Sequence, residues 1–362
     1  MSEREVPSET SVRVPVEFLR GLTRAAFTTA GLDEESAAIV EEVLVRTSLR
    51  GVASHGLHAV PQYRRQLLEG GAKADAPLSV EAERGGVIRV DAHAALGPLA
   101  ASQATELAIA RARAHGVAIV SVRNANHFGA AGHYALQGAE AGCIAMVAAN
   151  TPPIMAVTGS RARTIGNSPL GFGAPRTGGV PFVLDIAMSR VAGGKVRLAL
   201  QRGAQVPFGW ILDPDGEPTT EPADFLERRG ALVPMEDHKG YGLSLMVETL
   251  AGALSGAAML HGVGNWLYTP ETPSDTGYFL MLIDASPDSL YDGVQARIGE
   301  LCERISAAPL APGAERILIP GELEAEHEMR ALEGGLELPE SAWAPLRALA
   351  VEIGLDLPRT VR

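Results

Sequence analysis

The fold class can be predicted from three neighbouring segments: GVIRVD (residues 86–91), PLAASQATELAIARARAH (98–115) and VAIVSV (117–122). The first and third segments are short and rich in Val and Ile, which is typical of strands. The middle segment is Ala-rich and amphipathic, opens with proline and is followed by Gly116, which are start and stop signals of a helix. This order of strand, helix and strand predicts a mixed α/β fold in which helices cover a partly parallel sheet.

The rest of the chain extends this unit on both sides. Asp33 can cap a helix that begins at residue 34, and the nearly continuous apolar character of residues 241–254 predicts a buried helix. We expect the terminal segments to form one discontinuous helical domain, residues 1–75 plus 312–362, beside a central α/β domain of residues 76–311. Helices are expected at residues 16–30, 34–49, 58–69, 130–141, 241–254, 323–332 and 341–353, and further strands at residues 143–149, 180–186, 278–284 and 316–319.

Composition restricts the function. The 362 residues include 31 Lys and Arg against 43 Asp and Glu, a net charge of −12, so neither a nucleic acid nor a membrane surface is expected as a partner. Cys143 and Cys302 cannot form a disulfide framework, no apolar stretch has the roughly 20 residues of a membrane span, and no signal peptide is evident, which favours a cytoplasmic protein. The 40 glycines exceed the usual share of about 7%. They suggest a small-molecule enzyme, because glycine allows a ligand to approach the backbone closely.

Two histidine motifs are candidates for proton transfer, since a histidine pKa near 6.5 suits that task at neutral pH. The first is Ser54-His55-Gly56, and its alternative interpretation is a capping serine beside a surface histidine. The second is His127 in NANHFG (124–129), between an expected strand and an expected helix, where ligands of open α/β sheets bind. A neighbouring Asn could orient His127, and the alternative is a histidine that only caps the helix.

Two further segments could bind an anion. Residues 158–173 combine glycines, hydroxyl side chains and two arginines, as phosphate-binding loops do, although neither a Walker loop nor a GxGxxG fingerprint is present. A plain tight connection explains this segment equally well. Lys239 lies near the start of the apolar helix, where the positive end of the helix macrodipole disfavours a lysine unless an anion binds.

Metal-ion and serine-hydrolase chemistry are not expected. His55 and His58 are three residues apart, as are Glu324 and His327, but neither pair has further spaced ligands. The sequence also lacks a GxSxG nucleophile elbow.

Seven motifs in order over 275 residues resemble those of the malate/L-lactate dehydrogenase family, which also contains ureidoglycolate, sulfolactate and diketogulonate oxidoreductases and cyclic-imine carboxylate reductases. The motifs are RGVASHGLHAVPQYRRQLLEGG (50–71), NANHFGAAGHYA (124–135), TIGNSPLGFGAPR (164–176), VLDIAMSRVAGGKV (183–196), VPFGWILDPDGEPTTEP (206–222), HKGYGLSLMVETLAGALSGA (238–257) and LIPGELE (318–324).

The resemblance implies a nicotinamide-binding fold other than the Rossmann fold, in a homodimer or larger homo-oligomer with the cofactor near the subunit interface. It implies hydride transfer between NAD or NADP and a 2-hydroxy acid/2-oxo acid pair. The alternatives are an NAD(P)H-dependent imine reductase that acts on cyclic imino carboxylates and a catalytically silent dinucleotide-binding protein. NAD and NADP are not distinguished, because Arg161, Arg163 and Arg176 could serve either a 2′-phosphate or the pyrophosphate.

The resemblance also assigns site residues. The proton-transferring histidine of the family falls on His127 or His55. We favour His127 because of its place at a strand end, with His55, beside Ser54, polarising the carbonyl group or binding the carboxylate. A substrate carboxylate needs a cation, for which Arg50, Arg64 and Lys239 are candidates. The cofactor contacts of the family fall on Thr151, Asn167, Asp185, Ile186, Ala187, Lys239, Gly321 and Glu322.

The sequence departs from the family pattern near the first histidine motif. Many members have an arginine where this chain has Ala59, and an acidic residue where it has Ala53. The family motif GTNP reads GNSP here, and His238 replaces a small or aromatic residue. Without the arginine as a carboxylate clamp, affinity for a small dicarboxylate should fall. We therefore expect a bulkier or less charged substrate, or an imine.

Overall fold

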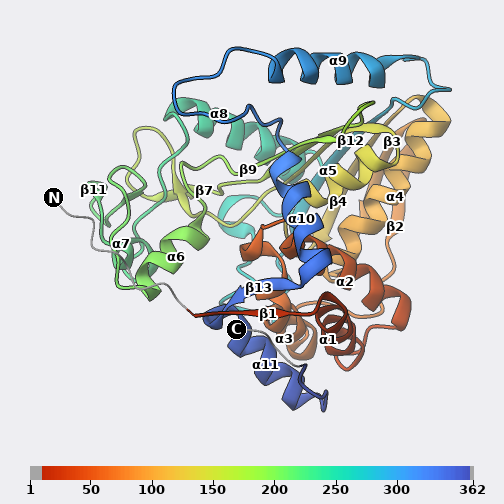
Figure 1. Cartoon of the computed structure of the whole chain (residues 1–362). Helices are drawn as coiled ribbons and strands as arrows, with labels where there is room; N and C mark the ends of the chain where they lie inside the picture. Colours follow the sequence, from red (N-terminus) through yellow and green to blue (C-terminus); the bar gives the residue numbers. More distant parts are fainter. Residues whose placement is uncertain (1–9, 359–362) are drawn as a thin grey trace.

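The structure, a computed structural model, describes residues 10–358 (Figure 1). Its centre is a seven-stranded sheet with the strand order β2-β3-β4-β12-β5-β8-β9. Among these strands, β3 and β4 pair in parallel and the other five neighbouring pairs are antiparallel. The strands are β2 (Ser79–Arg84), β3 (Val87–Asp91), β4 (Val117–Ala125), β5 (Cys143–Ala149), β8 (Leu170–Ala174), β9 (Phe182–Ile186) and β12 (Thr276–Asp284).

The expected parallel unit is confirmed for its first two strands only. β3 and β4 are connected by α4 (Gly97–His115), which includes Pro98 in its first turn and ends at Gly116 with φ 83°. β4 and β5 do not pair, because β12 lies between them and runs antiparallel to both. Nearly every residue of β12 is buried, so this strand suits the centre of the sheet.

Helices cover both faces of the sheet. On one face, α4 packs against β4 and β12, and α5 (Ala131–Glu140) packs against β5 and β8. On the other face lies α8 (His238–Val247), continued by a π-helical segment, Glu248–Ala253, that packs against β12.

The expectation that residues 241–254 are buried is wrong in part. Val247 and Ala251 are buried, whereas Leu245 is 48% exposed and Leu254 is 56% exposed. One side of this helix packs on the sheet, and within residues 10–358 nothing covers the other side. Apolar composition predicted burial, but it does not distinguish a core from a surface that another chain could cover.

The two ends of the described chain meet. β1 (Ser11–Val14) pairs antiparallel with β13 (Leu336–Pro339), and α11 packs against α1 and α3 (Figure 1). Asp33 caps the second helix as expected, since its Oδ1 accepts the Ser36 N–H at 2.7 Å. The helices of this layer are α1 (Val16–Thr28), α2 (Glu34–Leu49), α3 (Val60–Glu69), α10 (Glu322–Gly334) and α11 (Glu340–Glu352).

The strand expected at residues 316–319 is wrong. These residues are irregular, and the Ile319 N–H is held by the Glu322 carboxylate rather than by a neighbouring strand. Pro320 then accepts the Val183 N–H, and α10 begins two residues later. The short apolar run therefore lies beside β9 without joining the sheet.

Two hydrophobic cores result. One core runs from the terminal helices to the α4 side of the sheet, so it spans both of the domains expected from the sequence; their boundaries remain a prediction. The other core, around Met155, Val191 and Phe225, lies on the opposite side of the sheet.

No helix within residues 10–358 is long and apolar enough to cross a membrane. The remaining elements include β6 (Met155–Ala156), β7 (Arg163–Ile165), β10 (Ile211–Leu212), β11 (Pro218–Thr219), α6 (Gly193–Gln201), α7 (Pro222–Leu226) and α9 (Val294–Ser306).

The packing of α11 can be tested by substituting Trp343 with Ala. Trp343 is buried and meets the Phe18 ring edge-on, with ring centroids 6.1 Å apart. Its loss leaves a cavity between α11 and α1, which should lower the free energy of unfolding by about 3–5 kcal/mol. Urea denaturation followed by circular dichroism measures this change. Val351→Ala on the 63% exposed side of α11 is the control and should change the free energy by less than about 0.5 kcal/mol. A loss below about 1 kcal/mol for Trp343→Ala would contradict the packing.

Candidate active site

Three buried tyrosines hold the segment that carries His127. This segment turns from the end of β4 into α5. The Tyr278 hydroxyl donates to the carbonyl of Asn126, and the Tyr134 hydroxyl donates to the carbonyl of Phe128. Between them, the Tyr63 hydroxyl lies 2.6 Å from Nδ1 of His127. The histidine is thus fixed both by its backbone neighbours and by its ring.

Asn126 fixes the loops around this segment. Its Nδ2 donates to the carbonyls of Gly71, Ala94 and Ala95, and its Oδ1 accepts from Gln66 Nε2 and from the Ser274 N–H. Asn126 is completely buried. The expectation that an asparagine orients the ring of His127 is therefore wrong for Asn126, because its side-chain amide forms hydrogen bonds to the surrounding loops instead. The residue that contacts the His127 ring nitrogen is Tyr63.

The two histidine motifs, far apart in sequence, face each other. His55 ends a 3-10 turn, Ala53–His55, and its Nδ1 lies 2.8 Å from Ser54 Oγ. The rings of His55 and His127 are nearly parallel, with centroids 5.8 Å apart and 24° between their planes. Both side chains are partly exposed. A small molecule that reaches one imidazole can therefore reach the other.

Trp266, which was not predicted from the sequence as a site residue, adds a third aromatic ring beside His127 and Tyr63. Its ring stacks on His127 with centroids 4.4 Å apart and on Tyr63 with centroids 4.8 Å apart. Gln62 Nε2 donates to the Trp266 carbonyl and thereby holds the loop against α3. The sequence feature that could have indicated this role is the position of the tryptophan in a connecting loop, because functional residues concentrate in loops. Tyr63 had no signal of its own, because its position fits a buried residue of the expected helix at 58–69.

Both histidines are neutral at pH 7 in the free protein. Protein surrounds each ring although solvent reaches part of it, and this desolvation lowers the pKa of both groups. Desolvation, together with the smaller effect of the charge on a protonated His55, lowers the pKa of His127 to about 3. A lowered histidine pKa means that the proton is released, so at pH 7 neither imidazole is charged.

The predicted cofactor-binding residues Thr151, Asn167 and Asp185 gather around the ends of β8 and β9. Thr151 Oγ1 lies 3.5 Å from Asn167 Oδ1, and the Asn167 carbonyl accepts the Met188 N–H, which brings Ile186 and Ala187 close to this pair. Asp185 accepts the Gly132 N–H at 3.0 Å. Desolvation raises the pKa of this carboxyl to about 6, although the Gly132 N–H lowers it.

Gly321 and Glu322 reach the same strand from the C-terminal part of the chain. The Pro320 carbonyl accepts the Val183 N–H of β9, and a Cβ on Gly321 would lie 3.0 Å from that nitrogen. Glu322 pairs with Arg176 at 2.7 Å. Because that pair occupies its carboxylate, Glu322 is available to a ligand mainly through its backbone.

The two arginines proposed as substrate ligands are engaged elsewhere. Arg50 pairs with Glu328 at 2.8 Å and reaches the Gly321 carbonyl, and Arg64 pairs with Glu352 at 2.9 Å. Substrate binding by either residue would require its ion pair to open, so their roles remain predictions. Lys239, in the first turn of α8, is exposed and has no side-chain partner within residues 10–358.

The three arginines considered as ligands of a 2′-phosphate also differ in whether their side chains are already engaged in other contacts. Arg163 donates to the carbonyls of Gly230 and Phe225, and Arg176 is held by Glu322. Arg161 is largely exposed, with a long contact of 3.8 Å to Asp215. Of the three, Arg161 is therefore the most available to an anion.

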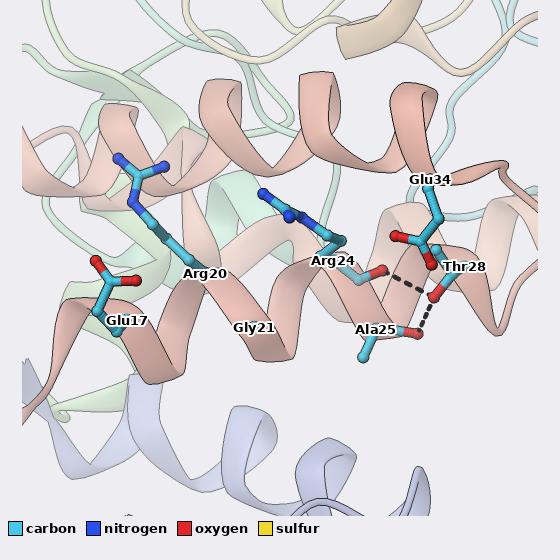
Figure 2. Close-up of a pocket in the computed structure, with 7 residues that line it drawn as sticks. All are labelled: Glu17, Arg20, Gly21, Arg24, Ala25, Thr28 and Glu34. Carbon is cyan, nitrogen blue, oxygen red and sulfur yellow. Dashed lines mark hydrogen bonds between the residues drawn. The ribbon is translucent and has the colours of Figure 1, made fainter.

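A hollow of about 350 Å³ lies elsewhere, on the surface of α1 (Figure 2). Two arginines, Arg20 and Arg24, point into it, and both pair with Glu41 of α2. None of the predicted site residues lines this hollow. Within residues 10–358, no three His, Cys, Asp or Glu side chains are arranged so that they could hold a metal ion.

Comparison with known proteins gives a consistent result. A family model described as malate/L-lactate dehydrogenase matches residues 14–347. Malate dehydrogenase of Pyrococcus horikoshii is 34% identical over 98% of this chain and 99% of its own length, and its solved structure matches with a TM-score of 0.88 over 99% of this chain and 100% of that one. A (2R)-3-sulfolactate dehydrogenase (NADP(+)) of Chromohalobacter salexigens is 35% identical over 91% of this chain and 96% of its own length.

A third relative is a reductase of solved structure. The delta1-piperideine-2-carboxylate reductase from Pseudomonas syringae pvar. tomato matches with a TM-score of 0.83 and 32% identity, over 93% of this chain and 99% of that one. These matches extend over nearly the whole chain and agree with the mixed α/β sheet described above. The chain belongs to the malate/L-lactate dehydrogenase family of oxidoreductases.

Proposed function

We propose that this protein catalyses reversible hydride transfer between NAD or NADP and a 2-hydroxy acid/2-oxo acid pair. The observation that carries the proposal is the facing pair of His55 and His127, neutral and partly open to solvent, in a member of this family. When bound, a reduced nicotinamide supplies the hydride, so no protein nucleophile is needed. The carbonyl electron pair moves to the oxygen atom, and this oxygen must receive a proton from the protein.

We assign the donated proton to His55. This differs from the sequence-based prediction, which favoured His127 because of its place at the end of a strand. The two rings are too close to be protonated together, and the charge of a protonated His55 lowers the pKa of His127, which desolvation already lowers. An anionic substrate would favour uptake of one proton by the pair. His55 would then donate this proton to the oxygen, while a neutral His127 hydrogen-bonds the substrate.

The residues around β9 fit a dinucleotide. Thr151 and Asn167 present a hydroxyl and an amide 3.5 Å apart, and Asp185 of β9 adds a carboxylate held by the Gly132 N–H; groups of these kinds suit ribose hydroxyls and a carboxamide. Lys239 supplies an unpaired positive charge for phosphate. These residues would hold the cofactor without a Rossmann unit, because within the described sheet β3 and β4 are the only parallel neighbours.

The surroundings of His55 favour a substrate with one carboxylate. Ala59, where many members of the family have an arginine, is buried just before α3 and offers no charge. The aromatic face of Trp266 beside His127 suits an apolar or cyclic group. The same features suit a cyclic imino carboxylate, which is the class of compound named for the Pseudomonas syringae relative. Imine reduction is therefore the second candidate.

We also propose that the protein forms a homodimer or a larger homo-oligomer through the exposed side of α8 and the segment after it. Leu245, Met246, Leu254 and Met259 are all exposed there. Apolar groups that gather at one place on a surface usually mark an interface.

The primary test is an oxidation assay at 340 nm with NADH and NADPH against a panel of 2-oxo acids and one cyclic imino acid. We expect turnover, with a monocarboxylic oxo acid or the imino acid preferred over oxaloacetate. His55→Gln should lower kcat by about 10²- to 10⁴-fold while dinucleotide binding is retained. His261→Gln, a change at an exposed residue of the loop that carries Trp266, is the control and should leave kcat unchanged. Absence of turnover across the panel would contradict the proposed function, and best turnover on oxaloacetate would contradict the preference for one carboxylate.

The reaction should depend on pH in one direction only. Because the histidine pKa values lie below the ordinary 6.5, only a small fraction of the free enzyme is protonated at pH 7, and this fraction falls about tenfold for each further pH unit; kcat/KM for reduction should fall by the same factor between pH 7 and 9. Oxidation uses the neutral pair, so its kcat/KM should stay level over this range. Initial rates at constant ionic strength measure both. A reduction rate that does not change with pH would rule out the histidines as the proton source.

The assembly can be measured by light scattering during gel filtration. We expect at least twice the 37.9 kDa chain mass. Leu245→Glu places a charge on the exposed apolar side and should shift the protein towards the monomer. Leu68→Glu, a similar change at an exposed residue of α3, should not. A monomeric wild-type protein would contradict the proposed assembly.

A further inference from the structure

The hydroxyl group of Tyr63 has one acceptor. Tyr63 is completely buried in α3, and its Oη lies 2.6 Å from His127 Nδ1. Within residues 10–358 this hydroxyl makes no other hydrogen bond. A buried O–H group that donates to nothing is strongly disfavoured. The Tyr63 proton therefore points at Nδ1 of His127.

This direction decides where the proton of the neutral imidazole sits. A neutral imidazole carries one N–H and one acceptor nitrogen, and the hydrogen bond at one nitrogen selects the form. Since Nδ1 accepts from Tyr63, the proton is on Nε2. Nε2 has no partner among the described residues, and the side chain is partly exposed. Desolvation, which lowers the pKa of His127, keeps the ring in this neutral form.

We propose that Tyr63 is a positioning residue that holds His127 as the Nε2–H tautomer, so that the ring always presents an N–H donor to the substrate. This inference rests on the proposed function for its catalytic meaning, but the tautomer itself is a property of the free protein. With the proton on Nδ1 instead, Nε2 would present a lone pair to a carbonyl or carboxylate oxygen and would repel it. A donor that stays neutral also leaves the transferred proton to His55.

The surroundings of Tyr63 support a role that is specific to the ring. Tyr134 and Tyr278 are equally buried, but their hydroxyls donate to backbone carbonyls, which can only accept. Of these three tyrosines, Tyr63 is the one whose hydroxyl contacts an imidazole, which can carry its proton on either of two nitrogens. Trp266 stacks on both Tyr63 and His127, with 15° and 14° between the ring planes, and holds the two rings together.

The tautomer can be read by NMR of the whole protein labelled with ¹⁵N-histidine, since protonated and unprotonated ring nitrogens resonate far apart. His127→Gln identifies the signals of His127. We expect the wild type to show a protonated Nε2 and an unprotonated Nδ1 at pH 7.5. In Tyr63→Phe the pattern should change to a mixture or to the Nδ1–H form. A protonated Nδ1 in the wild type, or an unchanged pattern in Tyr63→Phe, would overturn the proposal, and neither result depends on knowing the substrate.

Kinetics then test the catalytic consequence. Tyr63→Phe should lower kcat for the best substrate by about 10- to 100-fold, the usual cost of losing a partner that orients a working side chain. Dinucleotide affinity should change less than about threefold. Thr105→Val removes a buried hydroxyl of α4 that donates to the Ala101 carbonyl, and it should keep both the wild-type tautomer and a kcat within about threefold. Equal losses of kcat in the two variants would show that Tyr63 acts only through packing.

Discussion

The candidate active site depends on the side-chain amide of Asn126. This amide joins the end of α3, the loop before α4 and the loop before β12 through five hydrogen bonds. α3 carries Tyr63, and the last of these loops carries Trp266. The next residue along the chain is His127. A single buried, fully bonded group thus sets the relative positions of segments that are distant in sequence, which is the type of buried polar network that specifies one arrangement.

Local signals were sufficient to predict much of the fold. The cap at Asp33, the glycine stop at Gly116 and the strand at residues 143–149 could all be derived from short segments, because each depends on neighbours in sequence. The place of β12 could not be predicted in this way. An apolar strand pattern shows that a segment is buried in a sheet, but not which strands it separates.

The site was predictable only in part for a related reason. His55 and His127 follow from their motifs, whereas Tyr63 lies in a helix whose pattern explains a buried residue without any chemical role. Arg50 and Arg64 were reasonable ligands by charge. The structure shows both in ion pairs, with Glu328 and Glu352, that connect the N-terminal helices to the C-terminal ones. Sequence alone does not tell an arginine that holds the fold together from one that is free to bind a substrate.

The pairing of β1 with β13 has a consequence for biosynthesis. Ser11 is among the first described residues to leave the ribosome, and its partner Pro339 is among the last. At a translation rate of roughly 5–20 residues per second, many seconds pass between the synthesis of α1 and α2 and the synthesis of α10 and α11. During this time, apolar side chains that the C-terminal helices later cover are open to water. The N-terminal layer can therefore complete its packing only after α10 and α11 have been synthesised.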